Sequence, residues 1–153
     1  MSYQEKRSLS NIVMTVLIAV VYVLVTVSKY NNGDFDTSNE MKLWSTLILW
    51  FIPISVAARI ILTILFRIFS EIGREISGNK EDNIDLVDER DKLIELKANR
   101  ISLVVFGLGF IIALFTQAFD ASISVFFITF ITGGVLSEVL GNVFEVIYHR
   151  RGV

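Results

Sequence analysis

Four long apolar stretches, separated by polar segments, are the main pattern of the chain. They cover about residues 11–28, 43–69, 101–119 and 122–148, and few ionisable side chains interrupt them. A helix that crosses the hydrocarbon core of a bilayer needs about 20 mainly apolar residues. The pattern therefore predicts four membrane-spanning helices in a single transmembrane domain over residues 1–153.

The first stretch has one feature of a signal peptide, because Lys6 and Arg7 precede it. Its apolar run is longer than the roughly 7–15 residues of a signal peptide's hydrophobic region, and no clear A-x-A cleavage site follows. We therefore expect this helix to be retained.

Basic residues are distributed unevenly among the polar segments, which predicts an orientation. Two lie before the first stretch, two lie near the end of the chain, and most of the others lie between the second and third spans. The two remaining connections carry only Lys29 and Lys42. By the positive-inside rule, both termini and the middle segment, about residues 70–100, are expected in the cytoplasm. The protein is then a multi-pass protein of the cell (plasma) membrane.

Helical spacing continues beyond two of the membrane segments. Phe69, Ile72 and Ile76 extend an apolar stripe past the second span, and no proline or glycine separates Glu89 from the third span. We expect cytoplasmic extensions of the second and third helices, with about three turns of the third projecting as a stalk. Few residues, around Asp120, join the third and fourth spans, which predicts an antiparallel hairpin. The expected fold is all-α, an integral membrane four-helix bundle of two helical hairpins.

Composition narrows the candidate chemistry. The chain is 53% hydrophobic and 20% charged, and it has no cysteine, which excludes disulfides and thiolate metal sites. Its single histidine, His149, precedes Arg150 and Arg151, where we expect it to meet lipid headgroups. No concentrated basic patch of the kind that binds nucleic acid is present. No glycine-rich phosphate loop or nucleophile motif occurs, so we expect no cofactor.

Acidic residues collect before the third span. They are Glu81, Asp82, Asp85, Asp88, Glu89 and Asp91. Oxygen-rich clusters suit Ca²⁺ or Mg²⁺, but the spacing lacks the glycine of an EF-hand loop. We interpret the cluster as a solvated loop followed by a helix start, with Asp88 as the cap and Asp91 at the capping-box position. No metal site is expected.

Charged residues inside the spans require partners. A charge near the centre of a membrane helix costs about 2.5–3.5 kcal/mol on insertion scales, and such residues usually face protein or a water-filled cavity. Arg59 and Glu138 lie equally far from the start of the second and fourth spans, and Arg67 and Glu145 lie about two turns further on. These two spans are expected to run parallel. We therefore hypothesise two charge pairs, Arg59 with Glu138 and Arg67 with Glu145.

Small residues recur every four positions in the fourth span, at Gly133, Ser137 and Gly141. This spacing lets the backbones of two membrane helices approach closely. The stripe packs either within one bundle, against Gly107 and Gly109 of the third span, or between copies of the chain.

The string Asp88-Glu89-Arg90-Asp91, followed by Lys97-Ala98 and then directly by a membrane span, resembles a family of small prokaryotic four-span membrane proteins of unknown function. The layout matches over the whole chain, but the specific residues cover only this segment. The resemblance implies four helices and a bacterial or archaeal source, and it implies no activity.

Three kinds of function are then considered. The first is a non-catalytic membrane protein that acts through a protein partner, as an accessory, regulatory or immunity-type subunit, with the projecting helices as its docking surface. The alternative is an oligomeric transporter or channel for ions, protons or small solutes, in which Arg59, Glu138, Asn142 and Glu145 line a polar path. A membrane enzyme has the least support. The expected partners are the lipid bilayer and a protein partner or a second copy.

Overall fold

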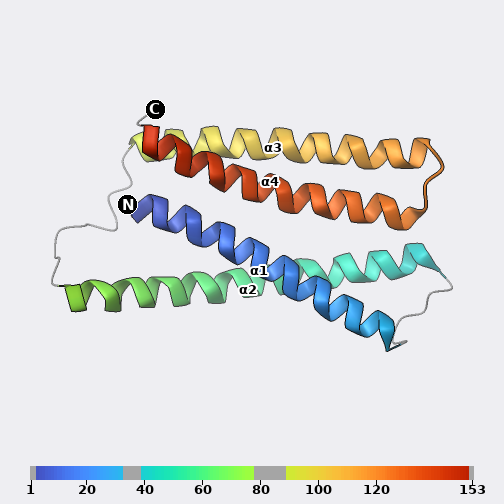
Figure 1. The fold of residues 1–153 in the computed structure, drawn as a ribbon, viewed down its shortest axis with the longest axis horizontal. Coiled ribbons are helices and arrows are strands. Elements are labelled where there is room, and N and C mark those ends of the chain that lie inside the picture. The colour runs from blue at the N-terminus through green and yellow to red at the C-terminus, as the bar shows by residue number, and fades with distance from the viewer. Residues whose placement is uncertain (1–2, 33–38, 78–88, 152–153) are drawn as a thin grey trace.

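The computed structural model describes residues 3–32, 39–77 and 89–151, and this part of the chain forms four helices and no strand (Figure 1). The helices are α1 (Tyr3–Asn31), α2 (Glu40–Ser77), α3 (Glu89–Ala118) and α4 (Ile123–Arg151). Each is long and apolar enough to cross a membrane. The predicted all-α class and the four long apolar helices are confirmed.

The helices extend beyond the apolar stretches, as helical spacing predicted for two of them. α2 continues through Pro53 to Ser77, and α3 runs unbroken from Glu89 into its apolar part. The start of α2 is capped by Asn39, whose side-chain oxygen accepts the backbone N–H of Lys42 at 3.1 Å. This bond satisfies one of the free N–H groups of the first turn.

A tight turn joins α3 to α4 and makes them an antiparallel hairpin (Figure 1). Asp120 has a positive φ of 55°. Its N–H donates to the carbonyl of Gln117 at 3.1 Å, and the N–H of Ala121 donates to the carbonyl of Thr116 at 3.0 Å. These two bonds form a Schellman motif, which closes the end of α3 and turns the chain back. α3 and α4 form the most extensive helix pair of the bundle.

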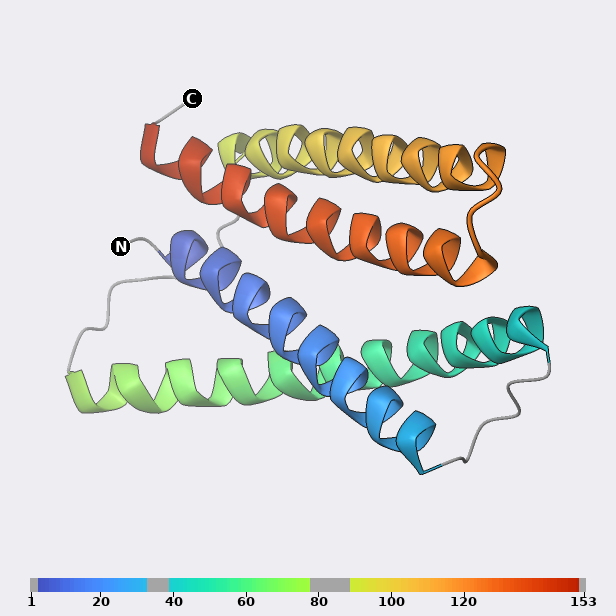
Figure 2. The same cartoon turned by 45° about the vertical axis from the view of Figure 1, so that its right-hand side comes forward.

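The packing of α1 and α2 differs from a simple hairpin. α1 crosses α2 at an angle (Figures 1 and 2), and it packs more extensively on α4 than on α2. α2 makes few contacts with α1 and α4, and no backbone approach joins it to α3 within the described ranges. The bundle is therefore a three-helix unit of α1, α3 and α4, with α2 attached along one side.

The start of α3, predicted to project as a stalk, packs against neighbouring helix ends. Ile94 and Ala98 are almost fully buried, and so is Ser8 at the start of α1. Asp91 contacts side chains of both α1 and α4. The first turns of α3 thus contact the beginning of α1 and the end of α4 through Asp91, and the Ala98 carbonyl lies against Gly141 of α4.

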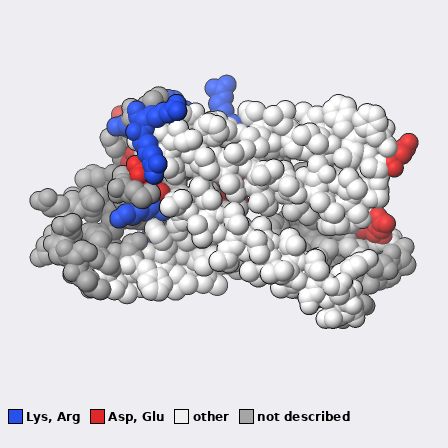
Figure 3. All heavy atoms as spheres, in the orientation of Figure 1, with Lys and Arg blue, Asp and Glu red and all other residues white. Residues whose placement is uncertain are grey.

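The outer surface of the bundle is largely apolar. Leu24, Leu49 and Leu103 are more than 60% exposed, together with many other large aliphatic side chains. On the face drawn in Figure 3, Lys and Arg gather mostly at the end where both termini lie, and the middle is almost entirely uncharged. An apolar surface of this extent suits contact with lipid, because soluble proteins rarely expose one.

Candidate functional site: a polar cavity among the four helices

A cavity of about 980 Å³ lies among all four helices, and polar side chains line most of it. It extends from the ends of the helices near the two termini to the level of Phe106 and Gly134 in the apolar part. Its ionisable residues are Arg7, Arg59, Arg67, Glu95, Glu138 and Glu145. Its amide and hydroxyl groups come from Gln4, Asn11, Thr15, Thr63, Asn99, Ser102, Ser137 and Asn142. Such a lining is unusual inside helices whose outer faces are apolar.

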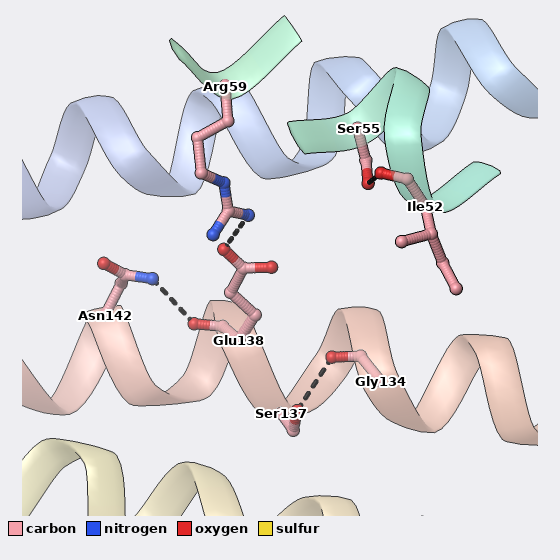
Figure 4. A network of polar contacts seen from close by, with 7 residues as sticks. All are labelled: Ile52, Ser55, Arg59, Gly134, Ser137, Glu138 and Asn142. Atoms are coloured by element: carbon pink, nitrogen blue, oxygen red, sulfur yellow. Dashed lines mark hydrogen bonds and ion pairs between the residues drawn. The ribbon is translucent and has the colours of Figure 1, made fainter. Parts of the chain in front are cut away.

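Arg59 of α2 and Glu138 of α4 form an ion pair in this cavity (Figure 4). Arg59 Nη2 donates to Glu138 Oε1, and the two side chains are 53% and 33% exposed. One turn along α4, Asn142 Nδ2 donates to the backbone carbonyl of Glu138 at 2.8 Å. The pair therefore joins α2 to α4 and borders the open space of the cavity.

Arg67 and Glu145, the second hypothesised pair, both line the cavity. Within the described residues no ion pair joins them, so the structure places them in one cavity without bringing their charges into contact. Arg7 of α1 and Glu95 of α3 line the same cavity, and sequence reasoning did not single them out. Both lie in polar helix extensions. A charge there is common, so nothing in the sequence distinguishes it as part of a site.

A second group of polar contacts lies at the end of the bundle near the termini. Asp91 of α3 accepts a hydrogen bond from Gln4 Nε2 of α1 at 3.4 Å, and its other carboxylate oxygen lies 3.6 Å from His149 Nδ1 of α4. Arg150 Nε lies 3.8 Å from a carboxylate oxygen of Glu5. These contacts tie α1, α3 and α4 together beside the cavity, which Gln4 also lines.

The position of His149 corrects the sequence expectation. Its side chain is only 9% exposed and faces Asp91, so it packs inside the helix cluster and does not reach outward to lipid headgroups. The other residues of the predicted cytoplasmic motif behave differently. Glu89, Arg90 and Lys97 are exposed, and Asp88 lies outside the described residues, as do Glu81, Asp82 and Asp85.

The stripe of Gly133, Ser137 and Gly141 is buried against α3. A Cβ added at Gly133 would lie 3.0 Å from the Cα of Gly109, and one added at Gly141 would lie 3.0 Å from the Cβ of Ser102. The stripe thus packs within the bundle and sets the close approach of α3 and α4. Gly107 takes no part, since nothing lies within 4 Å of a Cβ placed there.

The other end of α2 is held by a separate set of contacts. Trp44 Nε1 donates to Ser124 Oγ of α4 at 2.9 Å, and the Trp44 ring stacks on Phe127 with ring centroids 5.8 Å apart. The hydroxyl of Tyr22 in α1 donates to the backbone carbonyl of Leu47. Together with the Arg59–Glu138 pair, these contacts attach the first half of α2 to the three-helix unit.

The cavity can bind and orient charged or strongly polar groups, because guanidinium and carboxylate groups line it together. The resemblance of the Asp88-Glu89-Arg90-Asp91 segment to small prokaryotic four-span proteins stays a prediction. No protein-family model matches the chain, and comparison with curated proteins and with solved structures gives no match.

Proposed function

We propose that the chain is a non-catalytic, multi-pass protein of the cell membrane that admits a small charged solute into its polar cavity and passes it across the bilayer, acting as an oligomer. The proposal includes an orientation in which both termini lie in the cytoplasm. This orientation rests on the basic residues at the end of the bundle that carries both termini, since Lys and Arg are enriched in cytoplasmic segments.

The observation that carries the proposal is the lining of the cavity. Three arginines and three glutamates line a volume of about 980 Å³ between helices whose outer faces are apolar. Ionisable residues inside membrane segments are costly, and where they face a water-filled cavity they commonly mark the path of a substrate or an ion. Both Arg59 and Glu138 stay accessible, so their charges are available to a solute in the cavity.

Flux through the purified protein in proteoliposomes tests the proposal. Glu138→Gln and Arg59→Gln should lower the flux of a transported ion or solute at least about tenfold, while Arg100→Gln, on an exposed position of α3 outside the cavity, should leave it unchanged. Folding is checked separately by monodisperse elution in detergent. No flux of any tested ion or polar solute above empty liposomes, from well-folded protein, contradicts the proposal.

A second candidate is the non-catalytic subunit that acts through a protein partner, and the packing of α2 favours it. Beyond Arg59, α2 continues for five turns with little contact to the other helices, and Ile64, Ile68 and Phe69 are exposed there. A partner helix or a second copy could cover this apolar side. Cross-linking from single cysteines placed along α2 distinguishes a heterologous partner from a homo-oligomer. If neither cross-link forms, lipid covers this side of α2.

A further inference from the structure

Four of the six ionisable residues in the cavity lie at a similar depth. Arg67 and Glu145 lie about two turns beyond Arg59 and Glu138 along the parallel helices α2 and α4, which is about 11 Å closer to the end that carries the termini. Gly141 packs on Ser102 and Ala98, so Glu95, one turn before Ala98, lies near the level of Glu145. Arg7 follows Glu5, which contacts Arg150, and so enters the same zone from α1.

These four residues, Arg7, Arg67, Glu95 and Glu145, are called the charged ring below. In the part of the chain that the structure describes, none of them forms an ion pair, although Arg59 and Glu138 neutralise each other deeper in the cavity. The charged ring therefore offers two guanidinium and two carboxylate groups to the cavity. Its members come from four different helices and line one common cavity.

The balance of charge in the ring selects among ligand classes. A simple anion would be attracted by the two arginines and repelled by the two glutamates. A simple cation would be attracted by the glutamates and repelled by the arginines. A molecule that carries one cationic and one anionic group can satisfy both signs at once through charge-assisted hydrogen bonds. Asn11, Asn99 and Ser102 lie in the same cavity and can bind its uncharged polar groups.

We propose that the charged ring binds a zwitterion, with its anionic group on Arg7 and Arg67 and its cationic group on Glu95 and Glu145. The inference rests on the proposed function, for which it names the solute class. The cavity is at the upper end of the size that ligand sites usually have, about 300–1,000 Å³, so it accommodates a free amino acid as well as the headgroup of a zwitterionic lipid.

Binding is measured by isothermal titration calorimetry on the purified full-length chain in detergent. The probes are the zwitterions glycine, phosphoethanolamine and phosphocholine, with choline and inorganic phosphate as single-charge counterparts. We expect at least one zwitterion to bind at least about tenfold more tightly than both choline and phosphate. The inference is overturned if choline or phosphate binds as tightly as the best zwitterion, or if none of the three zwitterions binds to folded protein.

Variants connect the binding to the ring. Arg67→Gln and Glu145→Gln should each weaken binding of that zwitterion about tenfold or more, because each removes a charge-assisted hydrogen bond. Arg100→Gln and Glu89→Gln, at exposed positions of α3 outside the cavity, are the matched controls. If a ring variant elutes as aggregate, Arg7→Gln or Glu95→Gln replaces it, since each removes a ring charge at an exposed position. Unchanged affinity in the folded ring variants overturns the assignment.

The source of the zwitterion is decided by the surrounding lipid. In nanodiscs of phosphatidylethanolamine, a headgroup site should bind added phosphoethanolamine several-fold more weakly than in nanodiscs of anionic phosphatidylglycerol, because the lipid competes. A site for a free solute should show equal affinity in both. Failure of this inference is separable from failure of the proposed function, since flux of a singly charged ion without zwitterion binding removes only the inference.

Discussion

At the scale of single residues, the ion pair of Arg59 and Glu138 joins two helices that otherwise touch little. It was predictable because equal sequence offsets place residues at equal depths in parallel helices. Arg7 and Glu95 were not predictable in this way, since they lie in polar extensions whose packing depends on how four helix ends meet. The burial of His149 likewise depends on the α3–α4 register, which places Asp91 opposite it.

Charge reversal tests the inner pair. Arg59→Glu and Glu138→Arg should each lower the thermal unfolding midpoint in detergent, because each places two like charges together. The loss of a charge-assisted hydrogen bond corresponds to about 1.5–3 kcal/mol. The double variant should recover most of the loss, with Arg100→Glu as the control on an exposed site. A double variant no more stable than the worse single variant would contradict the pairing.

Close packing of α3 on α4 predicts that larger residues at the contact lower the stability of the protein. Gly133→Ala and Gly109→Ala place a Cβ about 3 Å from the opposite backbone, so the helices must separate. Overpacking of this kind typically costs about 1–3 kcal/mol. Gly107→Ala is the control, because it meets open space and adds a better helix former. Equal thermal unfolding midpoints for all three variants would show that the close approach has no energetic role.

At the scale of elements, sequence order was a good guide to one hairpin and a poor guide to the other. The short connection around Asp120 left α3 and α4 no alternative to antiparallel packing. The longer connection between α1 and α2 imposes no such limit, and α1 instead buries Ser8, Thr15 and Ile18 as its packed side. A few small polar residues on an apolar helix do not indicate which neighbouring helix they face. The packing of α1 on α4 was therefore not predictable from the sequence.

The attachment of α2 at Trp44 gives an element-scale prediction. Trp44→Phe keeps an aromatic ring against Phe127 but removes the hydrogen bond to Ser124, so unfolding free energy should fall by about 1 kcal/mol. Trp50→Phe is the matched control, since Trp50 is 64% exposed. Thermal aggregation followed by size-exclusion chromatography compares the two. A larger loss for Trp50→Phe would contradict the assigned attachment.

At the scale of the whole molecule, the end with both termini carries most basic residues, one end of the cavity and the contacts of Asp91. Four helices of spanning length were predictable from the length of the apolar stretches, because hydrocarbon thickness determines the length of a spanning helix. The cavity does not follow from length or composition. It depends on α2 standing apart from α3, which no local pattern encodes.

The proposed orientation is open to direct test because the chain contains no cysteine. Single cysteines at Asn32 and at Lys97, both exposed positions, provide one label site on each proposed side. A membrane-impermeant maleimide added to intact cells should label Asn32→Cys and spare Lys97→Cys, and permeabilised cells should label both. The opposite pattern would reverse the topology and place both termini outside the cell.

The pairing of Arg59 with Glu138 also has a consequence for biosynthesis. α2 is made before α4, so in the proposed membrane arrangement Arg59 is inserted while its carboxylate partner is still unsynthesised. During this interval the arginine bears an insertion cost of about 2.5–3.5 kcal/mol, unless the insertion machinery or water shields it. α1 also lacks its main packing partner during this interval, because that partner is α4, the last helix of the chain. A chain that ends after α3 therefore has three helices without the one they all pack against, α4, and such truncated chains should be prime substrates for membrane proteolysis.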